Sequence, residues 1–237
     1  MRPGVPAFRP HDRLGAVLRL AAQICALLPA DQAATLATIG GHIEWAVRPA
    51  KRRRLAENLA HATGRGPRDR YVRRLVHRNV TTGARRAAGT LWALARPEQA
   101  SHRVTIVPRE LLERMIADGR GVVLCSAHFG PYEAAGVASR SLPAGTELAA
   151  VTDENIIGRA LHRSRERMGL IVVAADASPR ELVTILGRGG IVALIADLHR
   201  PGMRGHVVRF LDGECILPGG PAAIARLAQA PLVPFAV

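Results

Sequence analysis

The sequence is poor in aromatic side chains, in cysteine and in acidic residues. Two Trp, two Tyr and four Phe make up 3% of its 237 residues, so a nucleic-acid-binding protein that stacks bases would have few platforms here. The three cysteines, Cys25, Cys125 and Cys215, are odd in number and far apart, which excludes a disulfide framework and a zinc pattern. We therefore expect a protein of the cytoplasmic side with a core of Ala, Val, Leu and Ile.

Long apolar runs are also missing. No segment reaches the roughly 18 uninterrupted apolar residues of a transmembrane helix. The best candidate, residues 14–29, is broken by Arg19 and Gln23 and lacks the small-residue cleavage site of a secretory signal. Its apolar residues follow a helical repeat, so the segment is either an amphipathic helix in a membrane interface or an ordinary surface helix.

Positive charge is concentrated at the front of the chain. Residues 1–100 hold 18 Lys or Arg and 6 Asp or Glu, against 15 and 13 in residues 101–237. A basic half of this kind indicates a surface that meets a polyanion, for which nucleic acid and anionic lipid headgroups both qualify. The alternative is a solvated basic face without a dedicated partner.

Periodicity predicts one domain, residues 1–237, with a basic helical part (1–100) and an α/β part (101–237). The expected strands are RVTIV, VVLCSA, ELAAVT, LIVVAA, GIVALIAD, HVVRF and LVPFAV. Helices are expected within PRELLERMIADGRG and around residues 157–168, 178–187 and 219–229. This alternation predicts an α/β fold with a mixed, largely parallel central sheet flanked by helices.

The stretch AHFGPYEAAG carries the strongest chemical signal. It places His128 at the end of the strand VVLCSA and Glu133 just beyond the turn at Gly130-Pro131, in the first turn of a helix that Pro131 begins. A carboxylate bonded to one nitrogen of an imidazole fixes its tautomer and raises the basicity of the other nitrogen, so the two residues form a candidate general-base pair. Alternatively, Glu133 is a helix-start acid favoured by the helix dipole, and His128 is a solvated loop residue.

Five blocks in order resemble bacterial lysophospholipid-type acyltransferases, in the branch that contains lipid A late acyltransferases and phosphatidylinositol mannoside acyltransferases. AHFGPYEAAG is similar to the HxGNWE/D block of that family. The other four blocks are RRRLAENLAHATG, SRERMGLIVV, LGRGGIVALIADLHRPG and VVRFLDGECILPGGPAAIARLAQAPLVPFAV. The resemblance covers residues 52 to 237 and departs from the family where Pro131-Tyr132 replaces Asn-Trp and Phe210-Leu211-Asp212 replaces Phe-Phe-Gly. Family members usually continue beyond the position of Val237, so we expect part of the cleft to be missing or supplied by a partner chain.

The resemblance implies roles for individual residues. His128 would be the general base on the acceptor hydroxyl and Glu133 its orienter, with Arg165 and Asp197 in the charge network of the active site. Arg165 is otherwise a helix-surface arginine, and Asp197 otherwise a helix or turn cap. The residues expected at the substrate are Phe129, Gly130, Tyr132, Pro218 and Gly220.

Two further residue groups suggest chemistry without a complete pattern. Cys125 lies three residues before His128, but strand alternation and apolar neighbours favour a core thiol over a nucleophile. His199 and His206 lack the further ligands of a metal site, so we expect no metal.

The implied activity is transfer of a fatty acyl chain from acyl-CoA or acyl carrier protein to a hydroxyl of a glycolipid or lysophospholipid-like acceptor, without an acyl-enzyme. Transfer to an amine acceptor remains open. The expected partners are an anionic membrane surface, the lipid acceptor and the acyl donor, with no nucleic acid and no cofactor beyond the donor. The expected location is peripheral, on the cytoplasmic face of the inner membrane. A catalytically idle lipid-binding protein and a basic nucleic-acid-binding protein are the alternatives.

Overall fold

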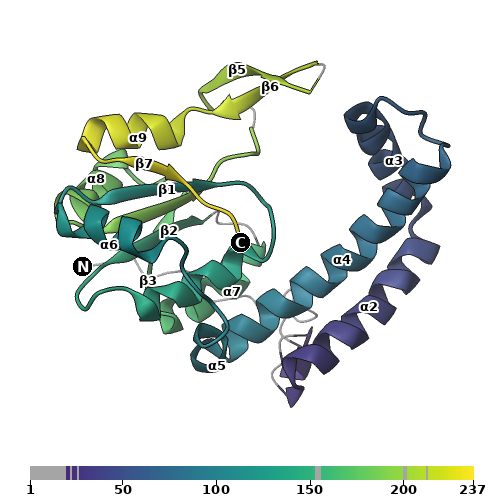
Figure 1. Ribbon diagram of the computed structural model, residues 1–237, viewed down its shortest axis with the longest axis horizontal. Helices are drawn as coiled ribbons and strands as arrows, with labels where there is room; N and C mark the ends of the chain where they lie inside the picture. The colour runs from purple at the N-terminus through teal and green to yellow at the C-terminus, as the bar shows by residue number, and fades with distance from the viewer. Residues whose placement is uncertain (1–19, 22, 26, 153–155, 200–201, 212) are drawn as a thin grey trace.

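The computed structural model describes residues 20–21, 23–25, 27–152, 156–199, 202–211 and 213–237. Half of the expected helix at 14–29 lies outside these residues, and the described residues 20–21, 23–25 and 27 are helical. The chain forms a helical arm followed by an α/β part (Figure 1). The arm consists of α2 (Ala30–Val47), α3 (Pro49–Thr63) and α4 (Arg70–Ala95). Within the described residues, no helix combines the length and the apolar character that crossing a membrane requires.

The arm is held together by close packing of α2 on α4. A Cβ added at Gly41 would lie 2.9 Å from the Cα of Thr81, so glycine lets the two helices approach. The long helix α4 begins at Asp69, whose side chain accepts a 2.6 Å hydrogen bond from the backbone N–H of Tyr71 and so satisfies one free donor of the first turn. Its valines at 72, 76 and 80, which are spaced four residues apart, are buried.

The α/β part is built on a five-stranded parallel sheet in the order β3-β2-β4-β1-β7. Its strands are β1 (Val122–Ser126), β2 (Leu148–Thr152), β3 (Leu170–Ala174), β4 (Ile191–Ile195) and β7 (Leu232–Pro234). Its helices are α5 (Pro97–Ser101), α6 (Arg109–Ala117), the 3₁₀ helix η1 (Tyr132–Ser141), α7 (Ile156–Arg167), α8 (Pro179–Gly187) and α9 (Gly220–Ala228). A separate antiparallel hairpin joins β5 (Gly205–Phe210) to β6 (Gly213–Pro218).

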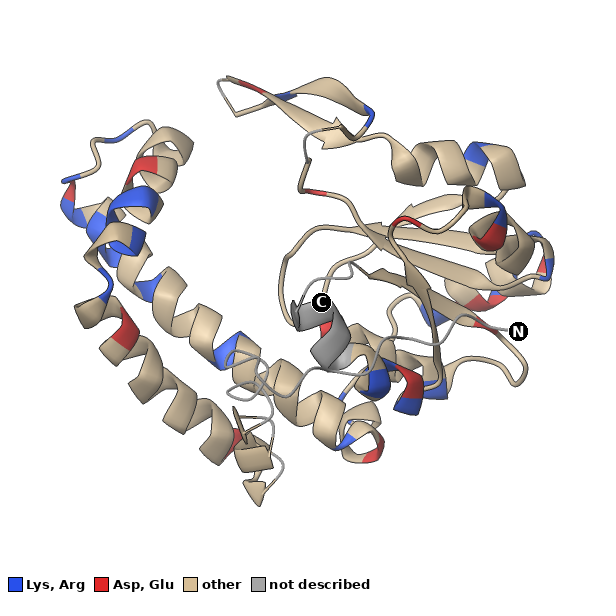
Figure 2. Ribbon diagram, turned by 180° about the vertical axis from the view of Figure 1, so that it is seen from behind, with Lys and Arg blue, Asp and Glu red and all other residues tan. Residues whose placement is uncertain are grey.

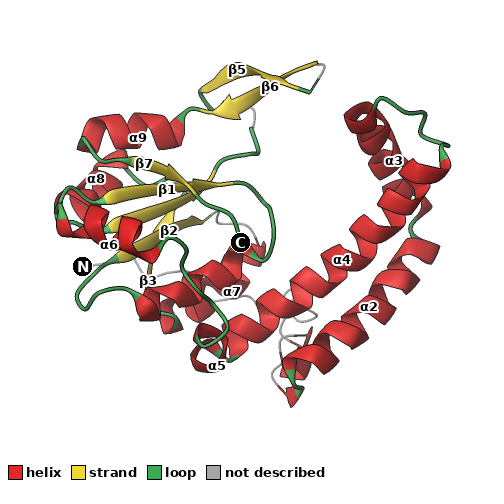
Figure 3. Cartoon of the chain, viewed as in Figure 1, coloured by secondary structure: helices red, strands yellow, loops and turns green. Residues whose placement is uncertain are grey.

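Both faces of the sheet are covered by helices, as the apolar strands require (Figure 3). Val122 and Ile191 pack on one face with Val137 of η1 and Trp92 of α4. On the other face, alternate residues of the same strands pack against α8 and α9. The predicted α/β fold with helices on the sheet is therefore confirmed, and its central sheet is parallel throughout.

Three details differ from the expectation. RVTIV, residues 103–107, is not a strand, because its N–H and C=O groups join no sheet and its side chains instead line a cavity. HVVRF forms β5, but in the separate hairpin rather than in the central sheet. Its partner β6 went unrecognised because its half-exposed residues lack the apolar run of a buried strand.

Candidate active site

The register of two neighbouring strands brings His128 and Asp197 together. Ser126 ends β1 directly opposite Ile195 at the end of β4, and each functional residue follows two positions later. The Nδ1 atom of His128 lies 2.6 Å from Oδ1 of Asp197. The backbone N–H of His128 donates a second hydrogen bond, 2.9 Å long, to Oδ2 of the same carboxylate. Asp197 therefore fixes both the backbone and the ring of His128 at the carboxyl edge of a parallel sheet, where ligand sites of such sheets lie.

The electrostatics of this pair determine which nitrogen of the ring is free. Burial alone would raise the pKa of the Asp197 carboxyl, but the hydrogen bonds from the backbone N–H and the ring of His128 outweigh it and lower that pKa below its ordinary value. An ionised carboxylate only accepts hydrogen bonds, so Nδ1 of His128 carries the proton. In the neutral ring with this tautomer, Nε2 is the nitrogen that can accept a proton.

Glu133 makes a different contact from the one we expected. Its carboxylate accepts two hydrogen bonds from Arg165, from Nη2 and, at 3.0 Å, from Nε. Arg165 also donates from Nη1 to the hydroxyl of Thr152. The side chains of Arg165 and Glu133 are only 10% and 14% exposed, and a guanidinium so far removed from water requires a carboxylate partner. The carboxylate that holds the imidazole in this structure is thus Asp197, from the neighbouring strand.

Thr152 was not identified from the sequence. It ends β2 at the same edge of the sheet, and a hydroxyl at a strand end followed by Asp153 and Glu154 was the only signal that could have drawn attention to it. Its contact with Arg165 links β2, α7 and η1 around the first turn after His128.

The residues predicted to bind substrate lie in different surroundings. Tyr132 lies edge-on to the His128 ring, with the ring centroids 5.0 Å apart. Burial, with a smaller effect of the Glu133 carboxylate, raises the pKa of the Tyr132 phenol, which is therefore neutral. Phe129 is exposed. Gly130 adopts φ +62°, and a Cβ there would lie 1.9 Å from the carbonyl oxygen of Val237.

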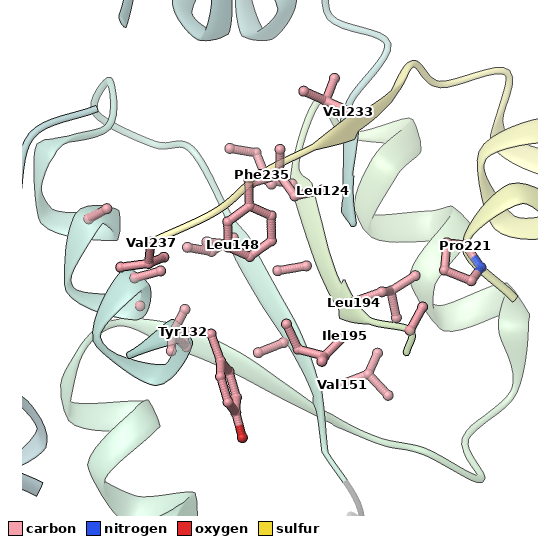
Figure 4. Close-up of a pocket in the computed structure, with 18 of the residues that line it drawn as sticks. Leu124, Tyr132, Leu148, Val151, Leu194, Ile195, Pro221, Val233, Phe235 and Val237 are labelled. Atoms are coloured by element: carbon pink, nitrogen blue, oxygen red, sulfur yellow. The ribbon is translucent and has the colours of Figure 1, made fainter. Parts of the chain in front are cut away.

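A large cavity of about 1410 Å³ adjoins these residues. His128, Tyr132, Glu133, Arg165, Pro218 and Gly220 line it together with many aliphatic side chains. Figure 4 shows Leu124 and Leu148 on one side of the cavity, and Val151 and Leu194 on the other. These pairs belong to the clusters on opposite faces of the sheet, so the cavity extends around the carboxyl edge on which His128 lies. The cavity is therefore largely apolar, and His128 is among the few polar side chains that line it.

The remaining candidates do not join this arrangement. Burial raises the pKa of the Cys125 thiol, which favours its neutral, non-nucleophilic form. His199 bonds to the carbonyl of Met203 at 2.9 Å, and His206 lies in β5. Within the described residues, no three His, Cys, Asp or Glu side chains gather as metal ligands would.

Comparison with known protein families gives a match along most of the chain. Residues 13–237 match the family model described as bacterial lipid A biosynthesis acyltransferase. No curated protein sequence matches the chain significantly.

Proposed function

The chain belongs to the bacterial lipid A biosynthesis acyltransferase family, and from this premise we propose that it moves a fatty acyl chain from a thioester to a hydroxyl of a lipid acceptor. The donor class is acyl-CoA or acyl carrier protein, and the acceptor class is a glycolipid or lysophospholipid. The observation that carries the proposal is the His128–Asp197 pair, in which His128 lines a large and mostly apolar cavity. Because the acceptor is amphiphilic, we place the reaction at the membrane surface, and the proposed donors, acyl-CoA or acyl carrier protein, favour its cytoplasmic side.

The chemistry follows from the free nitrogen of His128. Nε2 takes the proton of the acceptor hydroxyl as its oxygen attacks the thioester carbonyl. The tetrahedral intermediate collapses with cleavage of the carbon–sulfur bond, and the imidazolium returns its proton to the leaving thiolate. One ester and one thiol are formed, and no covalent enzyme intermediate is required. Asp197 holds the correct tautomer and stabilises the transient imidazolium.

Arg165, Glu133 and Thr152 act as positioning residues. Their hydrogen bonds join the end of β2 to the start of η1, the element that carries Tyr132 against the imidazole ring. A rigid link here keeps His128 correctly oriented toward the bound substrate, and orientation of this kind contributes strongly to transfer reactions.

The apolar cavity is assigned to the acyl chain. On one face of the sheet, Ala150 of β2 pairs with Ala193 of β4, and these small side chains leave space beside the sheet. Two residues earlier, Leu148 pairs with Ile191 and closes that space with larger side chains. A thioester carbonyl near His128 can therefore direct its alkyl chain along the strands and out of water.

Transfer of a radiolabelled acyl chain tests the proposal. Purified wild-type protein, His128→Ala and the control His102→Ala, a change of an exposed histidine after α5, are incubated with labelled acyl-CoA or acyl carrier protein and extracted bacterial lipids. We expect labelled lipid with the wild type and His102→Ala only. Equal incorporation by His128→Ala refutes the assigned base. Lipid binding without transfer by any form would indicate the catalytically idle alternative.

A further inference from the structure

The helix α2 exposes an apolar stripe that no described element covers. Four residues at helical spacing form it, with exposed fractions of 51% for Leu36, 53% for Ile39, 59% for Ile43 and 66% for Val47. At about 100° per residue, they lie within roughly 80° of one another around the helix. Gly41, which packs against Thr81 of α4, lies on the other side of the helix, and α4 lies between α2 and the α/β part (Figure 1). The stripe is therefore on the outer side of the arm.

The stripe contains no charge. The two acidic residues of α2 are Asp31 and Glu44, which lie roughly 100–120° from its centre at the helical repeat. Glu44 is turned toward α3, where its carboxylate accepts hydrogen bonds from Arg48 at 2.8 Å and Lys51 at 2.9 Å. One face of α2 is therefore uncharged and aliphatic, and the acidic residues of the helix are directed away from it.

Basic residues flank the end of this stripe. Of the four consecutive cations at the start of α3, Lys51 bonds to Glu44, and Arg52 donates to the carbonyl of Trp45 at 2.7 Å. Arg53 and Arg54 are exposed, and within the described residues neither side chain makes a hydrogen bond or an ion pair. Residues 48–86 together hold 13 Lys or Arg against 2 Asp or Glu. Figure 2 shows this positive charge gathered over α3 and α4, beside α2, which carries two acidic segments and no basic one.

We propose that the outer face of α2 is the surface by which the protein lies on an anionic membrane, with Leu36, Ile39, Ile43 and Val47 inserted among the acyl chains and Arg53 and Arg54 on the phosphates. The inference rests on the proposed function, because it names the surface that brings the active site to its lipid acceptor. An anionic membrane accounts for both features, because its acyl chains would bury the aliphatic stripe and its phosphates would neutralise the arginines. A second copy of the chain would cover the stripe but would add its own strongly basic arm.

Vesicle sedimentation tests this surface with the full chain. The vesicles are pure phosphatidylcholine or an equimolar mixture of phosphatidylcholine and phosphatidylglycerol. Ile39→Gln/Ile43→Gln removes the centre of the stripe, and Val207→Gln/Leu227→Gln is the matched control, since both control residues are 63% exposed and lie outside the arm. Arg53→Gln/Arg54→Gln tests the cations. Circular dichroism establishes that each variant is folded.

We expect wild type and control to bind the anionic vesicles, and the stripe variant to bind about 100-fold more weakly or worse, as loss of two inserted aliphatic side chains implies. The arginine variant loses the preference for anionic over neutral vesicles. Equal binding by the stripe variant and the control overturns the inference, as does a wild-type dimer that this variant makes monomeric. Acyl transfer in detergent micelles separates the two proposals, because the stripe variant retains it, whereas failure of the wild type there refutes the proposed function.

Discussion

Replacement of Asp197 by asparagine is the most informative single change at this site. It preserves the shape of the side chain but removes the negative charge that accepts two hydrogen bonds from His128. The amide offers one oxygen and one NH₂ group in place of two acceptor oxygens. If the NH₂ group faces Nδ1, the ring carries its proton on Nε2 instead, and this nitrogen no longer serves as a base.

The expected loss of activity has two parts. A hydrogen bond to a charged group is worth about 1.5–3 kcal/mol, which corresponds to a roughly 10- to 150-fold fall in rate if it is lost only in the transition state. The wrong tautomer adds to this, and the corresponding Asp→Asn change in a serine protease triad lowers kcat by about 10⁴. We therefore expect Asp197→Asn to lower kcat by about 10²–10⁴, with a smaller effect on KM.

Steady-state kinetics provide the assay. Thiol release from the acyl donor and label incorporated into lipid are followed together, at saturating and limiting donor. Glu133→Gln is the matched carboxylate control, because its oxygen still accepts from Arg165 and it does not contact the imidazole. We expect it to retain much more activity than Asp197→Asn. The reverse order, with Glu133→Gln inactive and Asp197→Asn near wild type, would refute the assignment of Asp197 as the partner of His128.

Other expectations concern stability and specificity. Because the pKa of Asp197 is lowered in the native protein, its stabilising effect is fully present above the ordinary value of about 3.9 and is lost as pH falls through the native value. Urea titrations should then show the stability difference between wild type and Asp197→Asn shrinking at acid pH, and a difference independent of pH contradicts this. Glu133→Ala leaves the Arg165 guanidinium without its carboxylate partner and should lower the free energy of unfolding by about 3 kcal/mol, measured by the same titration. A loss under about 1 kcal/mol would count against a stabilising role of this buried ion pair. Gly130→Ala should lower the free energy of unfolding by at least about 1–2 kcal/mol because residue 130 has a positive φ, and the added Cβ would displace the backbone of Val237 at the cavity. Wild-type stability and wild-type transfer in this variant would contradict the packing of Gly130 against Val237. Ala193→Leu should shift the donor preference to shorter acyl chains, because the larger side chain fills the cavity about 7 Å along the strand from Ile191, which closes it. An unchanged chain-length profile would argue against this part of the cavity as the acyl site.

Much of the fold follows from local pattern. The strands at 122–126 and 191–195 are apolar on both faces, and such runs between helical segments indicate a parallel sheet. RVTIV has the same composition, but it forms no strand, because pairing depends on an available sheet edge rather than on the segment itself. Strand order likewise depends on how distant segments meet, and no local pattern in the sequence specifies that β1 lies beside β4.

The sequence indicated which candidate residues would lie near one another more fully than it indicated which of them would be in contact. His128, Glu133, Arg165 and Asp197 all lie at the carboxyl edge of the sheet or in the first turns beyond it, but the sequence suggested that neighbours along the chain would pair. In the structure His128 pairs across 69 positions, because β1 and β4 end in register, while Glu133 satisfies a nearly buried arginine. Long-range register and the requirement of a buried charge for a partner determined these contacts.

Chemical rescue tests the central claim most directly. His128 is 42% exposed at its side chain, so removal of its ring in His128→Gly leaves a site that added imidazole can reach beside Asp197. We predict that the variant transfers no label alone and regains measurable transfer that saturates with imidazole, and that the double variant with Asp197→Asn shows far less rescue. Transfer by His128→Gly at the wild-type rate without imidazole would contradict the account.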